Sequence, residues 1–347
     1  MKILVTGISG RIGANLAKAL IEAGHEVRGL VWANDRRLDK LTTLNVELHE
    51  GTIENPADVD KAVTGVDAIC HLAAAFQGGG PFTSQQYFDI NVRGTFNMLE
   101  AARQHAPNLQ HFFYASTDAI YDKYIPGGIA GPIQEDTMKI APVGQYAVTK
   151  YLGEEMCQGY YRTYKLPVTI FRFALALAGD EVLTFPQFYL SYWRKVYENL
   201  LGDEAAQVRA QLEQLCPLSD EAAQKCLLIA HDENGRSYKK HVADVRDIVR
   251  GFTDALGKPG AVGEVFQLAA PTPYTWAETI PYLAQKLGVD YVDVRLAGHM
   301  TTFYEFDMSK GKQLFNYQPG YDMFKMIDDG VAFRAGQSTD VIPTHVV

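Results

Sequence analysis

Residues 2–13, KILVTGISGRIG, decide the fold: five strand-forming residues are followed at once by a turn with three glycines. An amphipathic pattern over residues 12–23 begins inside this stretch. Glycines let a backbone turn sharply and approach a pyrophosphate, and the free N–H groups at a helix start favour its negative charge. The succession of strand, glycine turn and helix therefore predicts a dinucleotide-binding turn built on Gly7, Gly10 and Gly13.

Strand-like and helix-like segments alternate onward from this turn to about residue 180. Further strands are expected at residues 26–31, 46–50, 67–73, 111–116 and 168–176, and helices at residues 56–63, 85–102 and 146–164. Continuous apolar strands separated by helices are typical of a parallel sheet that is buried on both faces. The pattern predicts an α/β fold with a doubly wound parallel sheet, the Rossmann fold.

The regular alternation ends after Gly179. Residues 185–230 are rich in helix formers and aromatic residues, without strand alternation. We expect a smaller, partly helical substrate lobe at the C-terminal side of the sheet. The expected division is a dinucleotide-binding domain over residues 1–180 to which residues 235–270 return, a lobe formed by residues 181–234 and 271–335, and a tail at residues 336–347.

The composition excludes several classes of protein. The 347 residues are 47% hydrophobic and 21% charged, as in globular proteins, and the net charge is -9 without basic clusters, which argues against nucleic-acid or membrane partners. No apolar run approaches the ~18 residues of a membrane span, and the first residues resemble a buried strand rather than a secretory leader. The four scattered cysteines lack metal-ligand spacing, so we expect a cytoplasmic protein with buried thiols and no metal site.

The GxxGxxG spacing after Thr6 resembles the extended branch of the short-chain dehydrogenase/reductase superfamily, the epimerase/dehydratase-like group. The resemblance continues through HLAA (residues 71–74), Asn91 in DINVRGT, FFYASTDAIYD (residues 112–122) and the pair Tyr146-x-x-x-Lys150. It covers residues 1–180 well and residues 235–290 loosely. These motifs are specific for the family and leave the substrate open.

The resemblance implies a bound NAD or NADP. The dinucleotide contacts that it implies are Gly7, Gly10, Arg11, Ile12, Gly13, Arg36, Thr52, Ile53, Leu72, Ala73, Ala74, Asn91, Tyr146 and Lys150. The second strand ends in Val31-Trp32, where a carboxylate would accept hydrogen bonds from the ribose of NAD. Asp35 follows beside Arg36 and Arg37, and a guanidinium there could bind a 2′-phosphate. Both dinucleotides stay open, with a slight preference for NADP.

The catalytic candidates are Thr117, Tyr146 and Lys150. Tyr146 and Lys150 are four residues apart in a helical stretch and therefore share a face. A phenol has an ordinary pKa of ~10, which a neighbouring ammonium lowers, so the pair forms a general acid/base. By resemblance, Thr117 hydrogen-bonds the reacting oxygen and Lys150 contacts the nicotinamide ribose. Tyr146 would exchange a proton with the substrate while hydride moves to or from the nicotinamide.

The substrate is less determined. Ala119 replaces the Glu of similar dehydratases, and residues 174–177 lack the Asn with which nucleotide-sugar epimerases bind diphosphate. We therefore expect an NAD(P)-dependent oxidoreductase for a secondary alcohol or ketone of a carbohydrate-like or other hydroxylated small molecule. The alternatives are a sugar or nucleotide-sugar epimerase with tightly bound NAD, and a non-catalytic dinucleotide-sensing protein. Candidate substrate contacts are Ser116, Asp118, Gln77 and Arg236, with the loop at residues 77–81 and the aromatic stretch at residues 185–193 as possible pocket walls.

A second copy of the chain is the expected partner. In the family that the motifs resemble, two long helices, here about residues 86–105 and 146–164, pair across a two-fold axis into a four-helix bundle. The apolar and aromatic content of the second helix is compatible with one face on the sheet and another on a partner. We therefore expect a homodimer.

Overall fold

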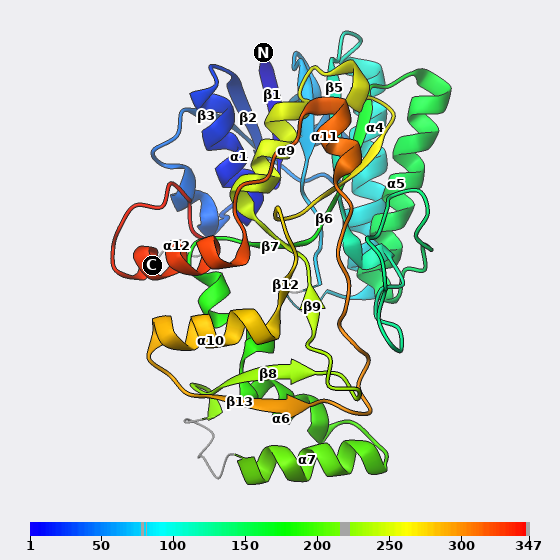
Figure 1. Ribbon diagram of the computed structural model, residues 1–347. Coiled ribbons are helices and arrows are strands. Elements are labelled where there is room, and N and C mark those ends of the chain that lie inside the picture. The colour runs from blue at the N-terminus through cyan, green and yellow to red at the C-terminus, as the bar shows by residue number, and fades with distance from the viewer. Residues whose placement is uncertain (78–79, 81, 216–222, 345–347) are drawn as a thin grey trace.

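A seven-stranded sheet forms the centre of the computed structural model, which describes residues 1–77, 80, 82–215 and 223–344. The strand order is β11-β6-β5-β4-β1-β2-β3, and every neighbouring pair is parallel (Figure 1). Its strands are β1 (Lys2–Thr6), β2 (Glu26–Val31), β3 (Val46–Glu50), β4 (Ala68–His71), β5 (His111–Thr117), β6 (Val168–Phe173) and β11 (Val265–Leu268). The predicted doubly wound fold is confirmed.

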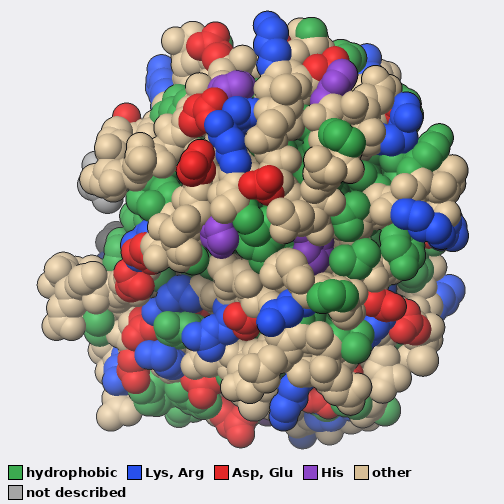
Figure 2. Space-filling model, turned by 90° about the horizontal axis from the view of Figure 1, so that it is seen from above, with side chains coloured by type: hydrophobic (Ala, Val, Ile, Leu, Met, Phe, Trp, Pro, Cys, Tyr) green, Lys and Arg blue, Asp and Glu red, His purple; other side chains and the backbone are tan. Residues whose placement is uncertain are grey.

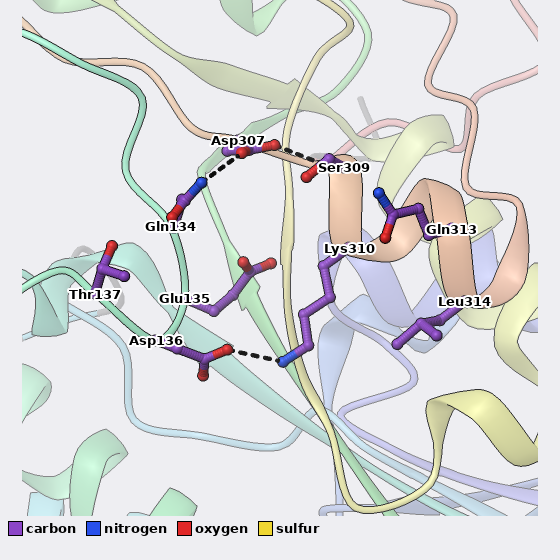
Figure 3. A pocket seen from close by; sticks show the side chains of 9 residues that line it. All are labelled: Gln134, Glu135, Asp136, Thr137, Asp307, Ser309, Lys310, Gln313 and Leu314. Atoms are coloured by element: carbon purple, nitrogen blue, oxygen red, sulfur yellow. Dashed lines mark hydrogen bonds and ion pairs between the residues drawn. The ribbon is translucent and has the colours of Figure 1, made fainter.

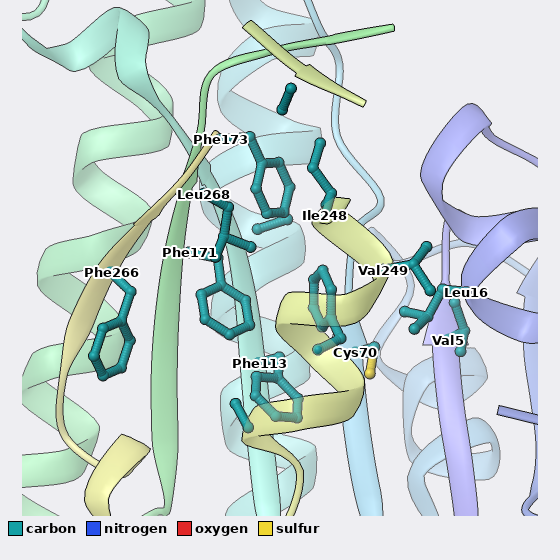
Figure 4. Close-up of a cluster of buried hydrophobic side chains, with 14 of the residues drawn as sticks. Val5, Leu16, Cys70, Phe113, Phe171, Phe173, Ile248, Val249, Phe266 and Leu268 are labelled. Atoms are coloured by element: carbon teal, nitrogen blue, oxygen red, sulfur yellow. The ribbon is translucent and has the colours of Figure 1, made fainter. Parts of the chain in front are cut away.

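Successive residues of each strand point to opposite faces of the sheet, and here they are apolar in both directions. Helices therefore cover both faces. On one face, Val5, Phe113 and Phe171 belong to a core cluster that Figure 4 shows in close-up. This cluster includes residues of α1 (Arg11–Glu22), α9 (Val245–Ala255) and α11 (Ser309–Phe315). On the other face, Leu4 and Phe112 pack with residues of α2 (Pro56–Val63), α4 (Gly94–His105) and α5 (Gly144–Tyr164).

The small lobe lies beyond the carboxyl ends of the strands, below the sheet in Figure 1. It contains α6 (Leu190–Glu198), α7 (Asp203–Leu215), α10 (Trp276–Leu287) and the pair β8 (Leu227–His231) and β13 (Tyr291–Arg295) around a core of its own. Two short pairs connect it to the sheet: β7 (Leu175–Leu177) with β10 (Val242–Asp244), and β9 (Lys239–Lys240) with β12 (Tyr274–Thr275). Strand β8 was not expected from the sequence, because the strand that pairs with it lies far along the chain.

The C-terminal segment is folded back along α1. Beyond α12 (Met323–Arg334), the side chain of Asn15 exchanges two hydrogen bonds with the backbone of Ile342, and Lys18 pairs with Asp340 at 2.6 Å. The described part of the predicted tail therefore has fixed contacts, and they lie on the helix that follows the glycine turn.

Other sequence-based expectations concern cysteines, charge and membranes. Cys70, Cys157 and Cys226 are buried, and Cys216 lies outside the described residues. Basic and acidic side chains are interspersed over the face seen in Figure 2, at the end of the molecule where the N-terminus lies. Across the described residues, no helix is long and apolar enough to cross a membrane, and no group of three His, Cys, Asp or Glu side chains could hold a metal ion.

Candidate active site

The glycine turn is packed too closely for any larger residue. Gly7 has a φ of +69°, and a Cβ added there would lie 2.9 Å from the amide nitrogen of Ala73. A Cβ on Gly13 would lie 2.2 Å from the carbonyl oxygen of Gly7. Gly10 is the residue that precedes the first turn of α1, and no side chain caps the backbone N–H groups of that turn. The N-terminus of α1 thus keeps backbone N–H groups free, and the turn before it contacts the segment after β4, where the strand order reverses, so this cradle fits a dinucleotide pyrophosphate.

A buried hydroxyl and imidazole attach the HLAA segment to this turn. The Thr6 hydroxyl accepts hydrogen bonds from the backbone N–H groups of Leu72 and Ala73, and it lies 2.8 Å from Nδ1 of His71. Burial, and after it the charge of Lys150, lowers the pKa of His71 to about 3, so the imidazole is neutral. The predicted contacts Leu72 and Ala73 thus lie beside the glycine turn, with Ala74 next in the same segment.

Asn91 lies in a π-helical segment, Phe88–Arg93, between α3 (Ser84–Tyr87) and α4. Its side-chain oxygen accepts a hydrogen bond from the backbone of Ala75, and its amide donates to the Ala75 carbonyl and to the Thr149 hydroxyl. These bonds use both amide hydrogens, so Asn91 connects the HLAA segment to the helix that carries Lys150.

Asp35 lies against the glycine turn. Its carboxylate accepts a 2.6 Å hydrogen bond from the Ser9 hydroxyl and two further bonds from the guanidinium of Arg37. Burial alone would raise the pKa of Asp35, but the hydrogen bonds from Arg37 and Ser9 lower it to about 2. Arg36, the predicted cofactor contact, is exposed at the start of a short helix, Arg36–Leu41. The same helix buries Lys40, which the sequence analysis missed and whose Nζ donates to the Ser9 carbonyl at 3.2 Å.

Four other predicted cofactor contacts have partners within the protein. The backbone N–H of Thr52 donates to Asp58. Ile53 is buried, and a Cβ on Gly94 would lie 2.6 Å from its Cδ1, which places α4 directly over this residue. Arg11 forms a 2.6 Å ion pair with Glu181 and donates to the Thr344 hydroxyl. Ile12 is partly buried and packs on the core beneath the turn.

Thr117, Tyr146 and Lys150 are brought together by β5 and α5. Thr117 is the last residue of β5, and Tyr146 and Lys150 occupy successive turns near the start of α5. The Thr117 hydroxyl approaches the Tyr146 phenol and acts to lower its pKa. Thr117 also accepts a hydrogen bond from the backbone of Ala119, so its hydroxyl hydrogen is available to the phenol oxygen. Strand β5 and helix α5 thus bring the Thr117 hydroxyl toward the Tyr146 phenol, with Lys150 one turn further along α5.

The electrostatics of this group differ from the expectation. Burial raises the pKa of Tyr146 to about 12, and the Thr117 hydrogen bond acts in the opposite direction. Lys150 is itself buried, with its Nζ 4.1 Å from the centre of the Tyr114 ring, and burial lowers its pKa to about 7. The expectation that Lys150 depresses the pKa of the phenol is therefore wrong, because desolvation dominates the pKa of Tyr146 and also lowers that of Lys150.

The predicted substrate contacts are dispersed. The Ser116 hydroxyl donates to Glu154 in the interior, and Glu154 forms a buried ion pair with Arg172 at 2.7 Å. Asp118 pairs with the buried Lys123 at 2.9 Å. Arg236 is bound to Asp232 and to the Gly127 carbonyl. Gln77 is exposed, and the loop residues Gly78, Gly79 and Pro81 lie outside the described residues.

The Glu154–Arg172 pair was missed by the sequence analysis. Arg172 also donates to the Tyr121 hydroxyl and to the Glu135 carbonyl, so every side of its guanidinium is engaged. The pair connects α5 to β6 beneath the Thr117 strand end. One signal was present in the sequence: Glu154 follows Lys150 by four residues and therefore lies on the same inward face of α5.

A surface pocket lies elsewhere (Figure 3). In it, Lys310 of α11 reaches toward Asp136 at 3.4 Å and also pairs with Glu264 at 2.9 Å. Its lining contains none of the predicted site residues: Gln134, Glu135, Asp136, Thr137, Asp307, Ser309, Lys310, Gln313 and Leu314. The candidate site is therefore defined by the glycine turn and the Thr117–Tyr146–Lys150 group.

Comparison with known proteins gives consistent matches. The model of the NAD dependent epimerase/dehydratase family matches residues 3–269. An uncharacterized UDP-glucose epimerase of Bacillus subtilis (strain 168), YtcB, is 27% identical over 96% of this chain and 98% of its own length. A 3-beta-hydroxysteroid dehydrogenase of Mycolicibacterium neoaurum is 40% identical over 58% of this chain and 52% of its own. A solved short-chain dehydrogenase/reductase superfamily protein from Agrobacterium tumefaciens with bound NAD has a TM-score of 0.80 and 27% identity, covering 97% of this chain and 98% of that one.

Proposed function

The chain belongs to the NAD-dependent epimerase/dehydratase family of extended short-chain dehydrogenase/reductase enzymes, and on that premise we propose that it oxidises a secondary alcohol or reduces the corresponding ketone. The substrate is a carbohydrate-like or other hydroxylated small molecule. The observation that carries the proposal is the approach of the Thr117 hydroxyl, at the end of β5, to the Tyr146 phenol, one helical turn from the buried Lys150.

Each of these residues has a distinct part in the reaction. Tyr146 exchanges a proton with the substrate oxygen, and Thr117 holds that oxygen and orients the phenol. Lys150, one turn further along α5, would hold the nicotinamide ribose. A nicotinamide dinucleotide bound on the glycine turn supplies the hydride acceptor or donor.

The cofactor that we propose is NAD, which reverses the slight preference for NADP drawn from the sequence. The Arg37 guanidinium, one of the groups that favoured NADP, is bound to Asp35 through two hydrogen bonds. A 2′-phosphate at this end of the glycine turn would face the ionised Asp35 carboxylate, whereas ribose hydroxyls would donate to it. The bound NAD in the A. tumefaciens structure supports the same choice.

The small lobe offers few groups for a nucleotide diphosphate, and this favours net oxidation or reduction over epimerisation of a nucleotide sugar. After Arg172-Phe173 the chain continues as the apolar strand β7, and Arg236, the candidate for a diphosphate, is already bound to Asp232. An epimerase is the second candidate, supported by the name of the B. subtilis relative. The two differ in outcome: an epimerase releases an isomerised product with no net change in nicotinamide absorbance. Turnover of either kind excludes a non-catalytic dinucleotide sensor.

Tyr146→Phe tests the proposal on a panel of sugars, lactones and hydroxy acids assayed by nicotinamide absorbance. The variant loses the proton donor, so we expect kcat to fall by at least about a hundredfold with dinucleotide binding unchanged. Tyr151→Phe, at the next residue beyond Lys150 on α5, is the matched control and should keep full activity. A Tyr146→Phe enzyme with more than a few per cent of the parent kcat would refute the assignment.

A further inference from the structure

Lys240 and Tyr274 face each other across the short pair of strands that joins the small lobe to the sheet. They are direct partners in the antiparallel pairing of β9 with β12, so their side chains project from the same face. Both are buried, with exposed fractions of 5% for Lys240 and 3% for Tyr274. The ring of Phe185 lies 4.9 Å from the Lys240 Nζ. Neither Lys240 nor Tyr274 belongs to a motif of the glycine turn or of the catalytic group.

These two side chains carry hydrogen-bond donors that the protein leaves unused. The Nζ of Lys240 donates to the side-chain oxygen of Gln187 at 2.9 Å, and no ion pair to it occurs within the described parts of the chain. An ammonium has three donors, and burying its charge opposite a neutral amide costs free energy. The Tyr274 hydroxyl is buried and has no hydrogen-bond partner among the described residues. Two unsatisfied donors therefore share one buried face.

Asp118 links the donor pair to the catalytic group electrostatically. This carboxylate follows Thr117 directly, and its charge acts on both the Tyr146 phenol and the Lys240 ammonium. Asp118 is itself neutralised by Lys123, which is buried with its Nζ 5.4 Å from the Tyr304 ring. The two lysines and the one carboxylate leave a single positive charge in this region.

We propose that Lys240 and Tyr274 bind a carboxylate group of the substrate, which makes the substrate a hydroxylated carboxylic acid such as a sugar acid. The proposal rests on the proposed function, because it places the bound acid beside Thr117 and Tyr146. A carboxylate carries the single negative charge that the region lacks, and its two oxygens can accept from both donors. A diphosphate would bring more charge than this pair compensates. Burial lowers the pKa of Lys240, and an anion at this position would restore its ammonium form.

Direct binding to the Tyr146→Phe protein in the presence of NADH tests this without turnover. Calorimetry compares hexuronates, aldonates and short hydroxy acids with the neutral sugar or alcohol that differs only at the carboxylate. We expect at least one acid to bind about tenfold or more tightly than its neutral counterpart, since hydrogen bonds to charged groups are the stronger ones. Equal or weaker binding of every acid would overturn the proposal.

Substitutions then locate the contact. Adding Lys240→Met should weaken binding of that acid by about tenfold or more, Tyr274→Phe by a few-fold, and Lys240→Arg by less than Lys240→Met. Lys239→Met is the matched control, because Lys239 precedes Lys240 on β9 and pairs with Glu305, and it should not change the affinity. Thermal unfolding confirms that each variant is folded. An acid that binds with the same affinity to the Lys240→Met and Tyr274→Phe variants would contradict the site.

The outcomes separate this proposal from the proposed function. Lys240-dependent binding of an acid, with no turnover of any substrate by the parent protein, would sustain the carboxylate site and refute the oxidoreductase. Nicotinamide-linked turnover of neutral alcohols that Lys240→Met leaves unchanged would support the oxidoreductase and refute the carboxylate site. Binding of inorganic phosphate or UDP that is lost in Lys240→Met while acids do not bind would show a phosphate site and overturn the carboxylate.

Discussion

The carboxylate of Asp35 accepts a 2.6 Å hydrogen bond from the hydroxyl of Ser9, and this contact joins the loop after β2 to the glycine turn. The usual position for an acidic residue, at the end of β2, holds Val31. The loop after β2 folds so that the carboxylate of Asp35, four residues after Val31, contacts the glycine turn instead. It is ionised at neutral pH, because the hydrogen bonds from Arg37 and Ser9 outweigh its burial and lower its pKa to about 2.

Asp35→Asn should therefore change the choice of dinucleotide. We expect NADH binding to weaken by about tenfold, the equivalent of one charge-assisted hydrogen bond, and NADPH binding to improve because the repelling charge is gone and Arg37 is released. Fluorescence titration of both reduced dinucleotides measures this. Asp39→Asn, an exposed position in the same short helix, should leave both dissociation constants unchanged. Tighter binding of NADPH than of NADH by the parent protein would contradict the assignment.

The parts of the site that the sequence predicts are those that depend on local spacing. The glycine turn and the pair Tyr146 and Lys150 are each set by neighbours within a few residues, and the structure places them as expected. Asp35 and Lys40 escaped prediction, because their approach to Ser9 depends on the path of an irregular loop.

The pairing of distant strands and the burial of individual side chains could not be predicted from the sequence either. Strand β8 exists because β13 pairs with it, and Lys240 meets Tyr274 only through the pairing of β9 with β12. The pKa values of Tyr146 and Lys150 are displaced chiefly by desolvation, which spacing along a helix does not reveal. A carboxylate site formed by distant residues has no sequence motif of its own.

Gly13→Ala should damage the dinucleotide cradle. The added methyl would lie 2.2 Å from the Gly7 carbonyl oxygen, so α1 must move away from the turn. We expect a loss of stability on the order of 1–3 kcal/mol, as for other overpacked sites, and at least tenfold weaker dinucleotide binding. Gly131→Ala is the control, because a Cβ there meets open space and no positive φ is required, so urea unfolding should show little change. An unchanged dissociation constant in Gly13→Ala would show that this part of the turn does not contact the ligand.

Lys150 should give the protein a distinctive pH dependence. Its pKa in the folded state is about 7, below the ordinary value of 10.5, so between these pH values the unfolded chain binds more protons than the folded protein. The free energy of unfolding contributed by this group must then increase with pH across that window, by at most about 1.4 kcal/mol per pH unit, and be flat below it.

The measurement is the difference in unfolding free energy between the parent and Lys150→Met, determined by urea unfolding from about pH 6 to about pH 9. The difference should move in favour of the parent as the pH rises. Lys139→Met removes an exposed lysine and should give a difference that does not depend on pH in this way. A pH-independent difference for Lys150→Met would mean that Lys150 stays charged throughout the range.

We propose that the chain forms a homodimer through α4 and α5. Large apolar side chains are exposed on the outer surfaces of these helices: Phe96 on α4 at 47%, and Val148 and Leu152, one turn apart on α5, at 39% and 41%. Because two such helices can bury these residues against their copies in a four-helix bundle, Leu152→Glu should convert the dimer into a monomer in light scattering at micromolar concentration. Leu201→Glu, at an exposed position of the small lobe, should stay dimeric. A monomeric parent protein would refute the interface.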